Sequence, residues 1–287
     1  MRKLLTFSQH FGLFPSKNKS RRSSNWLALF LLTLCLTALG NRAQAQTAET
    51  APDQLKNLLA QIDAAANKHA IQAVMQFYSQ NFTNSDGLTR QTIEQALIQL
   101  WQRYPQLKYQ TQLQSWKSEG NALIAQTVTS ITGNQSANSR NIVFNSIIQS
   151  QQRIEGEKIV QQNILSERSQ LSVGAKPPTV EVKLPIQVKT GQPYNFDAIV
   201  QQPLGDDYLL GAAIEEPVQA NKYLKPTPVE LELLQAGGLF KVGQAPAKPQ
   251  SVWVSGVLVG ADGMTMVTQR LQVVGGNPTE ASAPPLK

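Results

Sequence analysis

Apolar residues recur at helical spacing in three segments of the first half of the chain. An i, i+3, i+4, i+7 spacing places side chains on one face of an α-helix, so the pattern predicts amphipathic helices over residues 53–66, 70–82 and 91–104. The apolar positions are Leu55, Leu58, Leu59 and Ile62, then Ile71, Val74, Met75, Tyr78 and Phe82, then Ile93, Leu97, Leu100, Trp101 and Tyr104. Pro105 ends the third segment, because proline cannot continue a helix.

From Leu107 the period changes to two. Leu107, Tyr109, Thr111 and Leu113 alternate with lysine and glutamine, which is typical of a strand with one buried face. Three further strand-like segments follow at 122–133, 140–153 and 159–171, separated by polar or glycine-containing turns. Three short helices followed by an antiparallel meander predict an α+β fold in which the helices cover one face of a curved sheet.

The order of these elements and several short sequence segments resemble those of the NTF2-like superfamily. This superfamily of cone-shaped domains includes SnoaL-type cyclases and ketosteroid isomerase. The resemblance spans residues 50–171 and rests on "FYSQNF", the "SDG" loop, "LWQRYPQLKYQ" and the "EGN" hinge. It implies a cone whose interior can hold a small ligand, and it implies homodimers formed through the open sheet face. A shared fold carries little information about function.

A second domain is predicted after a Pro/Gly-containing linker at residues 172–178. Residues 179–275 show strand-like alternation with no helical period, including a hairpin signal at "ADG". Seven short strands in about 100 residues favour an all-β immunoglobulin- or fibronectin-like sandwich. Residues 276–287 have few bulky apolar side chains and are expected to form a disordered tail.

The N-terminal segment, residues 1–45, has the features of a secretory signal peptide. Basic residues precede the apolar run Trp26 to Gly40, and Ala43-Gln44-Ala45 forms an A-x-A cleavage site. We expect export to a periplasm, a thylakoid lumen or the extracellular space, with cleavage after Ala45. The alternative is an uncleaved anchor, which would tie the protein to a membrane; the apolar run is short for a bilayer span.

The charge distribution argues against a nucleic-acid partner. The chain carries 26 basic and 19 acidic residues, but seven of the basic residues and none of the acids lie in residues 1–45. The rest therefore holds 19 of each sign, with no basic run of the kind that phosphate backbones require.

The expected mature chain contains no cysteine and one histidine, His69. This composition excludes disulfides, thiol chemistry and Cys/His zinc sites from that chain. A catalytic triad would depend on His69, and no GxSxG-like elbow accompanies it; a capping or solvated histidine is the simpler interpretation. We expect no metal and no cofactor.

Asp86 is the one candidate catalytic residue. The resemblance to ketosteroid isomerase implies a general base in the loop after the second helix, where Asp86 stands, with Tyr78 as a candidate oxyanion donor. That chemistry needs a base together with hydrogen-bond donors. In the related enzyme the donors are a tyrosine on the first helix and an aspartate on the sheet. Here residues 53–66 contain no tyrosine and residues 120–152 contain no acid. A turn or capping role for Asp86 is therefore favoured.

A ligand pocket inside the predicted cone requires aromatic and apolar lining. The candidate lining residues are Tyr78, Trp101, Tyr104, Tyr109 and Phe144. The alternative is that these side chains simply fill the core. The leading hypothesis is an exported, non-enzymatic protein whose two domains bind a protein partner or a small apolar ligand. The competing hypothesis is an NTF2-like isomerase, dehydratase or cyclase that uses Asp86 with a pocket tyrosine.

Overall fold

The computed structural model describes residues 45–137, 140–203, 207–223, 225, 227–234 and 237–275. These residues belong to one compact unit. The apolar run Trp26 to Gly40 and the predicted tail 276–287 lie outside the described residues. Among the helices that are described, none combines the length and the apolar character that a membrane span needs.

The helices lie at the start of the described chain. They are α2 (Asp53–Asn67), α3 (Ile71–Met75) and α4 (Arg90–Arg103), preceded by a short 3-10 turn, η1 (Ala48–Thr50). Helix α4 begins with a capping box, in which the Thr89 side chain accepts from the Thr92 backbone and the Thr92 side chain accepts from the Thr89 backbone. Such a cap satisfies backbone donors that have no partner inside the helix.

Four long antiparallel strands form the sheet under the helices. They are β3 (Lys108–Glu119), β4 (Ala122–Ala137), β5 (Arg140–Glu155) and β6 (Lys158–Gly174), and they pair in sequence order. The short β1 (Gln46–Thr47) adds to the free edge of β3. The alternation predicted after Leu107 is confirmed, since Tyr109, Thr111 and Leu113 are shielded while the intervening side chains are exposed.

The second predicted helix is wrong beyond Met75. The chain leaves α3 and forms a strand, β2 (Tyr78–Asn84), which pairs in parallel with β6. Tyr78 and Phe82 pack edge to face at 5.0 Å. A spacing of four residues puts two side chains on the same face of either a helix or a strand. The spacing of Tyr78 and Phe82 therefore could not distinguish a helix from a strand. The open edge of β6 decides the outcome, because it offers backbone partners that a short helix lacks.

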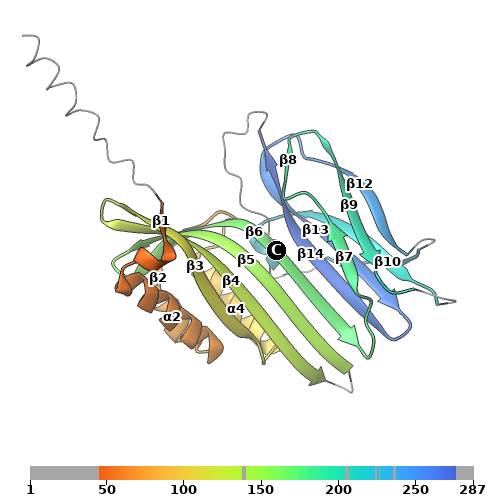
Figure 1. Cartoon of the computed structure of the whole chain (residues 1–287), viewed down its shortest axis with the longest axis horizontal. Helices are drawn as coiled ribbons and strands as arrows, with labels where there is room; N and C mark the ends of the chain where they lie inside the picture. Colours follow the sequence, from red (N-terminus) through yellow and green to blue (C-terminus); the bar gives the residue numbers. More distant parts are fainter. Residues whose placement is uncertain are drawn as a thin grey trace, which may run out of the picture. The chain divides into compact units, whose positions relative to one another are not determined.

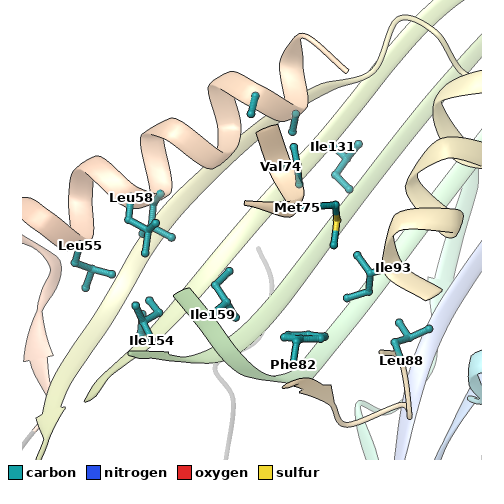
Figure 2. Close-up of a cluster of buried hydrophobic side chains, with 14 of the residues drawn as sticks. Leu55, Leu58, Val74, Met75, Phe82, Leu88, Ile93, Ile131, Ile154 and Ile159 are labelled. Carbon is teal, nitrogen blue, oxygen red and sulfur yellow. The ribbon is translucent and has the colours of Figure 1, made fainter. Parts of the chain in front are cut away.

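The first hydrophobic core lies between the helices and the sheet. Figure 2 shows side chains of α2 and α3 pointing toward strand residues such as Ile131 and Ile154. Leu55, Met75 and Leu107 are essentially inaccessible to solvent. Burial of this apolar face holds the helices on the sheet, at roughly 25 cal/mol per Å² removed from water.

The second half of the chain extends the same sheet. Strand β6 continues to Gly174 and pairs with β14 (Gly263–Val274), followed by β13 (Gln250–Gly260), β10 (Leu210–Pro217) and β11 (Glu232–Leu233), with β8 (Gln187–Lys189) also on β14 (Figure 1). A second sheet contains β7 (Val180–Lys183), β9 (Pro193–Val200) and β12 (Gly238–Gln244). A short 3-10 turn, η2 (Ala220–Tyr223), follows β10.

The α+β class is confirmed, but the sequence did not predict the sharing of a sheet. Among the described residues eleven strands join into one sheet and three form the smaller one. Phe196 of β9 and Leu258 and Leu271 of the large sheet meet in a second core. The first three residues of the expected linker, Ser172–Gly174, are part of β6. The predicted "ADG" hairpin joins β13 and β14 as expected.

Candidate functional site

A cavity of about 200 Å³ lies between the helices and the sheet of the first half. Its apolar walls come from α2, α4 and the strands beneath them, through residues such as Leu59, Leu97 and Ile148. Polar side chains and three tyrosines complete the lining. They are Asp63, Thr111, Asn84, Thr129, Ser150, Gln152, Gln162, Glu167, Tyr78, Tyr109 and Tyr223. Apolar walls with a few polar groups are typical of small-ligand pockets.

Two of the five predicted lining residues face this cavity. Tyr78 and Tyr109 both line it, and burial raises the pKa of each phenol to about 12. Burial favours the uncharged phenol. The Tyr109 hydroxyl accepts a hydrogen bond from the indole nitrogen of Trp101 at 2.8 Å. Both tyrosines therefore present neutral hydroxyl groups at neutral pH.

The other three predicted residues lie elsewhere. Trp101 is buried and stacks on His69 with ring centroids 5.0 Å apart. Tyr104 and Phe144 stack on each other at 5.4 Å beside a separate small hollow. His69 itself has a left-handed backbone conformation between α2 and α3, and its backbone N–H donates to Ala66. It thus lies in the short connection that follows α2 and precedes α3.

Most polar groups on the cavity floor have partners within the protein. Asp63 accepts from the backbone and the hydroxyl of Thr111, at 2.6 and 2.7 Å. The hydroxyl groups of Ser150 and Thr127 lie 3.1 Å apart. These bonds fix the polar side chains in place before any ligand enters.

Gln152 is the exception on this floor. Its side chain lines the cavity, the residue is 7 % exposed, and its carbonyl oxygen Oε1 has no hydrogen-bond partner among the described residues. A buried carbonyl oxygen without a partner costs free energy, about 1–3 kcal/mol. Solvent does not reach this oxygen in the present rotamer, so Gln152 carries an uncompensated polar atom beside the cavity.

Asp86 does not lie at the cavity surface; it belongs to a buried ion pair. The Arg270 guanidinium donates from Nη1 to Oδ1 at 2.8 Å and from Nη2 to Oδ2 at 2.7 Å. The side chains are 0 % and 3 % exposed, respectively. Tyr223 donates its hydroxyl to the same carboxylate at 2.5 Å, and Ser85 donates at 3.2 Å. Every oxygen of Asp86 is thus engaged.

Strand pairing explains why residues 184 positions apart meet. Strand β2 pairs with the first half of one edge of β6, up to Asn84 opposite Gln162, and β14 pairs with the second half, up to Gln269 opposite Arg168. Asp86 follows β2 in an Asx turn whose backbone N–H donates to Asn84 Oδ1 at 2.7 Å. Arg270 follows the paired stretch of β14. The two side chains therefore converge beside the same short segment of β6.

Glu167 and Tyr223 connect this ion pair to the cavity. Glu167 accepts from Arg270 Nη2 and from the Trp253 indole, both at 3.0 Å. The Tyr223 ring packs edge to face on Trp253 at 4.7 Å. Both Glu167 and Tyr223 line the cavity. One residue from the second half of the chain, Tyr223, thus contributes to a cavity that the helices and first strands otherwise line.

The electrostatics of the cluster keep Asp86 ionised. Burial alone would raise the pKa of this carboxyl, but the hydrogen bonds and positive charge of Arg270 outweigh it and lower the pKa. Burial raises the pKa of the Tyr223 phenol, and the neighbouring carboxylates raise it further. A carboxylate with a depressed pKa that is held by a bidentate guanidinium is a poor proton acceptor.

Sequence reasoning missed the partners of Asp86. Arg270 and Glu167 lie on strands whose local patterns show only alternation, and Tyr223 lies in a short 3-10 turn. The sequence around Arg270 gave no signal of burial, because its same-face neighbours on the strand, Thr268 and Gln272, are both polar. The alternation therefore places Arg270 on the face that sequence reasoning assigns to solvent.

The family comparison concerns the second half of the chain. Residues 175–274 match a family model described as a domain of unknown function, DUF8623. No curated protein sequence matches the chain.

Solved structures give distant matches. They include Bd1075 of Bdellovibrio bacteriovorus (15 % identity, 39 % of each chain, TM-score 0.28). A loop-truncation variant of IdmH has 11 % identity over 38 % of this chain and 89 % of its own, with a TM-score of 0.29. A candidate polyketide cyclase from Xanthomonas campestris pv. campestris has 16 % identity over 39 % and 89 %, with a TM-score of 0.27. The chain thus spans well under half of the Bdellovibrio protein.

Proposed function

We propose that this chain is an exported, non-enzymatic protein that binds a small ligand in the cavity of an NTF2-like first domain. The observation that carries the proposal is the cavity of about 200 Å³, beside which the Gln152 carbonyl oxygen has no partner among the described residues. A dry apolar cavity of about 150 Å³ is large enough for benzene, so this one suits a ligand with one or two rings. The polar floor supplies orientation.

The state of Asp86 supports binding over catalysis. A general base must reach the substrate and must accept a proton. Asp86 is separated from the cavity by Tyr223 and is bound by Arg270, and its pKa is depressed. We therefore assign Asp86 to joining the two halves of the chain, and we expect ligand binding to need no chemistry there.

Export with cleavage after Ala45 remains part of the proposal. It rests on the basic residues, the short apolar run and the A-x-A site of residues 1–45. N-terminal sequencing of the protein from its native host tests it. Gln46 as the first residue is the expected result, and an intact N-terminus in the membrane fraction would favour the anchored form.

Cavity binding is tested by filling the cavity. Ala66 lines it from α2, whereas Ala64 on the same helix is exposed. We expect Ala66→Phe to abolish binding of a one-ring probe such as 2-phenylethanol or 2-phenylethylamine, measured by calorimetry. Dissociation constants for ligands of this size fall between about 1 μM and 1 mM.

Ala64→Phe is the matched control, because it adds the same ring to the same helix outside the cavity. It should bind the probes like the unmodified protein, and circular dichroism should show both variants folded. If neither probe binds, or if Ala66→Phe binds them unchanged, the proposal is wrong.

A further inference from the structure

We propose that the ligand of this cavity is an organic cation, an amine with an apolar body of one or two rings. This inference rests on the proposed binding function and adds its chemical class. The residues that carry it are Asp63, Glu167 and the three cavity tyrosines, and Gln152 beside them has a carbonyl oxygen without a partner among the described residues.

The charged lining is acidic. Asp63 from α2 and Glu167 from β6 both line the cavity, and none of the described lining residues is lysine, arginine or histidine. An ammonium group between these elements would meet carboxylate oxygens, whereas a carboxylate ligand would meet like charge with no basic partner. In a site of low dielectric constant either effect is larger than in water.

Arg270 does not cancel this charge. Its Nη atoms are already bonded to Asp86, Glu167 and Tyr223. Two carboxylates around one guanidinium have a formal charge of −1, and Arg270 itself is buried behind Glu167 and Tyr223. The buried charge cluster therefore presents its negative member, Glu167, to the cavity.

The aromatic lining suits a cation as well. Tyr78, Tyr109 and Tyr223 come from β2, β3 and η2 and surround the same space. The face of an aromatic ring attracts a cation, and the attraction grows when the site is shielded from water. Burial keeps the Tyr78 and Tyr109 hydroxyls protonated up to a pKa of about 12, so they add no competing charge.

Gln152 gives the second line of support. Its side chain is more than nine-tenths buried, lines the cavity, and has a carbonyl oxygen without a donor. Solvent does not reach this oxygen in the present rotamer, and rotation of the amide by 180° exchanges the oxygen with the amide nitrogen. We expect an N–H donor of the ligand to bond the oxygen in the rotated state.

Three probes of similar size and different charge test the inference. They are 2-phenylethylamine, 2-phenylethanol and phenylacetate, titrated calorimetrically into the unmodified protein and into Ala66→Phe. We expect the amine to bind about tenfold more tightly than the alcohol, and phenylacetate to bind more weakly than either. The expected binding is lost in Ala66→Phe.

The variant Glu167→Gln tests whether the charge of Glu167 causes the preference for the amine over the alcohol. The glutamine retains an oxygen that can accept from Trp253. The variant should reduce the ratio of amine to alcohol affinity several-fold. Glu155→Gln removes a carboxylate from the surface, where Glu155 bonds only Arg153 among the described residues, and it should leave the ratio unchanged.

The outcomes separate the two proposals. Equal or tighter binding of the alcohol or phenylacetate, lost in Ala66→Phe, would overturn the cation inference and leave the binding function standing. Absence of cavity-dependent binding by all three probes would overturn the function, and the inference with it.

Discussion

Two arginines of this protein make the same kind of contact in opposite environments. Arg153 bonds Glu119 and Glu155 at 2.7 and 2.8 Å on the surface of the sheet, with 32 % of its side chain exposed. Arg270 bonds Asp86 and Glu167 at 2.7 and 3.0 Å and is 0 % exposed. The donor–acceptor distances and the partner types are alike in the two clusters. The clusters differ in how far their side chains are exposed to solvent.

The difference in solvent exposure determines how much each ion-pair cluster contributes to the stability of the fold. Water solvates each member of the surface cluster when a partner is lost, so these ion pairs contribute little to stability. In the buried cluster, loss of one partner leaves the other charge unpaired and out of reach of water. Such a loss lowers the free energy of unfolding by about 3–5 kcal/mol. The buried cluster also joins the loop after β2 to β6 and β14. It therefore makes the cavity-bearing half and the second half depend on each other.

The largest expected effect is that of Arg270→Met, which leaves Asp86 buried without its cation. We expect the free energy of unfolding to fall by about 3–5 kcal/mol in urea denaturation. The double variant Arg270→Met/Asp86→Asn removes both charges and should recover part of the loss. An effect below 1 kcal/mol for the single variant would contradict the buried pairing.

Tyr223→Phe should have an intermediate effect. It removes the hydroxyl that donates to Asp86 and keeps the ring that packs on Trp253. A hydrogen bond to a charged group contributes about 1.5–3 kcal/mol, and urea denaturation should show a loss in that range. Tyr208→Phe, at a residue that is 77 % exposed, is the control and should change nothing measurable.

Acid should weaken the protein partly through Asp86. Its folded pKa lies below the ordinary value, so its contribution is complete above the unfolded pKa of about 3.9 and is lost as the pH falls through the folded pKa. We expect Asp86→Asn to flatten the dependence of unfolding free energy on pH below about pH 4. An unchanged slope would mean that Asp86 titrates alike in both states.

The smallest effect is expected at the surface cluster. Arg153→Met should lower the unfolding free energy far less than Arg270→Met does, and 0.5 M salt should bring the variant still closer to the unmodified protein. The same urea titration measures it beside Arg270→Met. A loss as large as that of Arg270→Met would show that burial does not separate the two arginines.

Much of the fold could be predicted from the sequence because its signals are local. The apolar stripes of 53–66 and 91–104 and the alternation after Leu107 each follow from the residues that they contain. The strand Tyr78–Asn84 could not, because its spacing fits both periods and the edge of β6 decides between them. The shared sheet depends on pairing between β6 and β14, almost a hundred residues apart, and no local pattern records that pairing.

The candidate site was predicted only in part for the same reason. Tyr109 lies on the face that the alternation after Leu107 indicated, and Tyr78 was predicted on the apolar stripe of a helix but lies on a strand. Both reach the cavity. Asp86 stood out as a lone carboxylate in a loop, but its role depends on Arg270, which is distant in sequence. A turn residue and a buried ion-pair member look alike until strand pairing is known.

The tyrosines allow the most direct test of a ligand cavity. Tyr78, Tyr109 and Tyr223 line it, whereas Tyr104, Tyr194 and Tyr208 lie outside it. In protein labelled with ¹³C in its tyrosine rings, titration with 2-phenylethylamine should shift the signals of the first three saturably and leave the other three unchanged. Shifts confined to Tyr104, Tyr194 and Tyr208, or no saturable shift at all, would contradict ligand binding in this cavity.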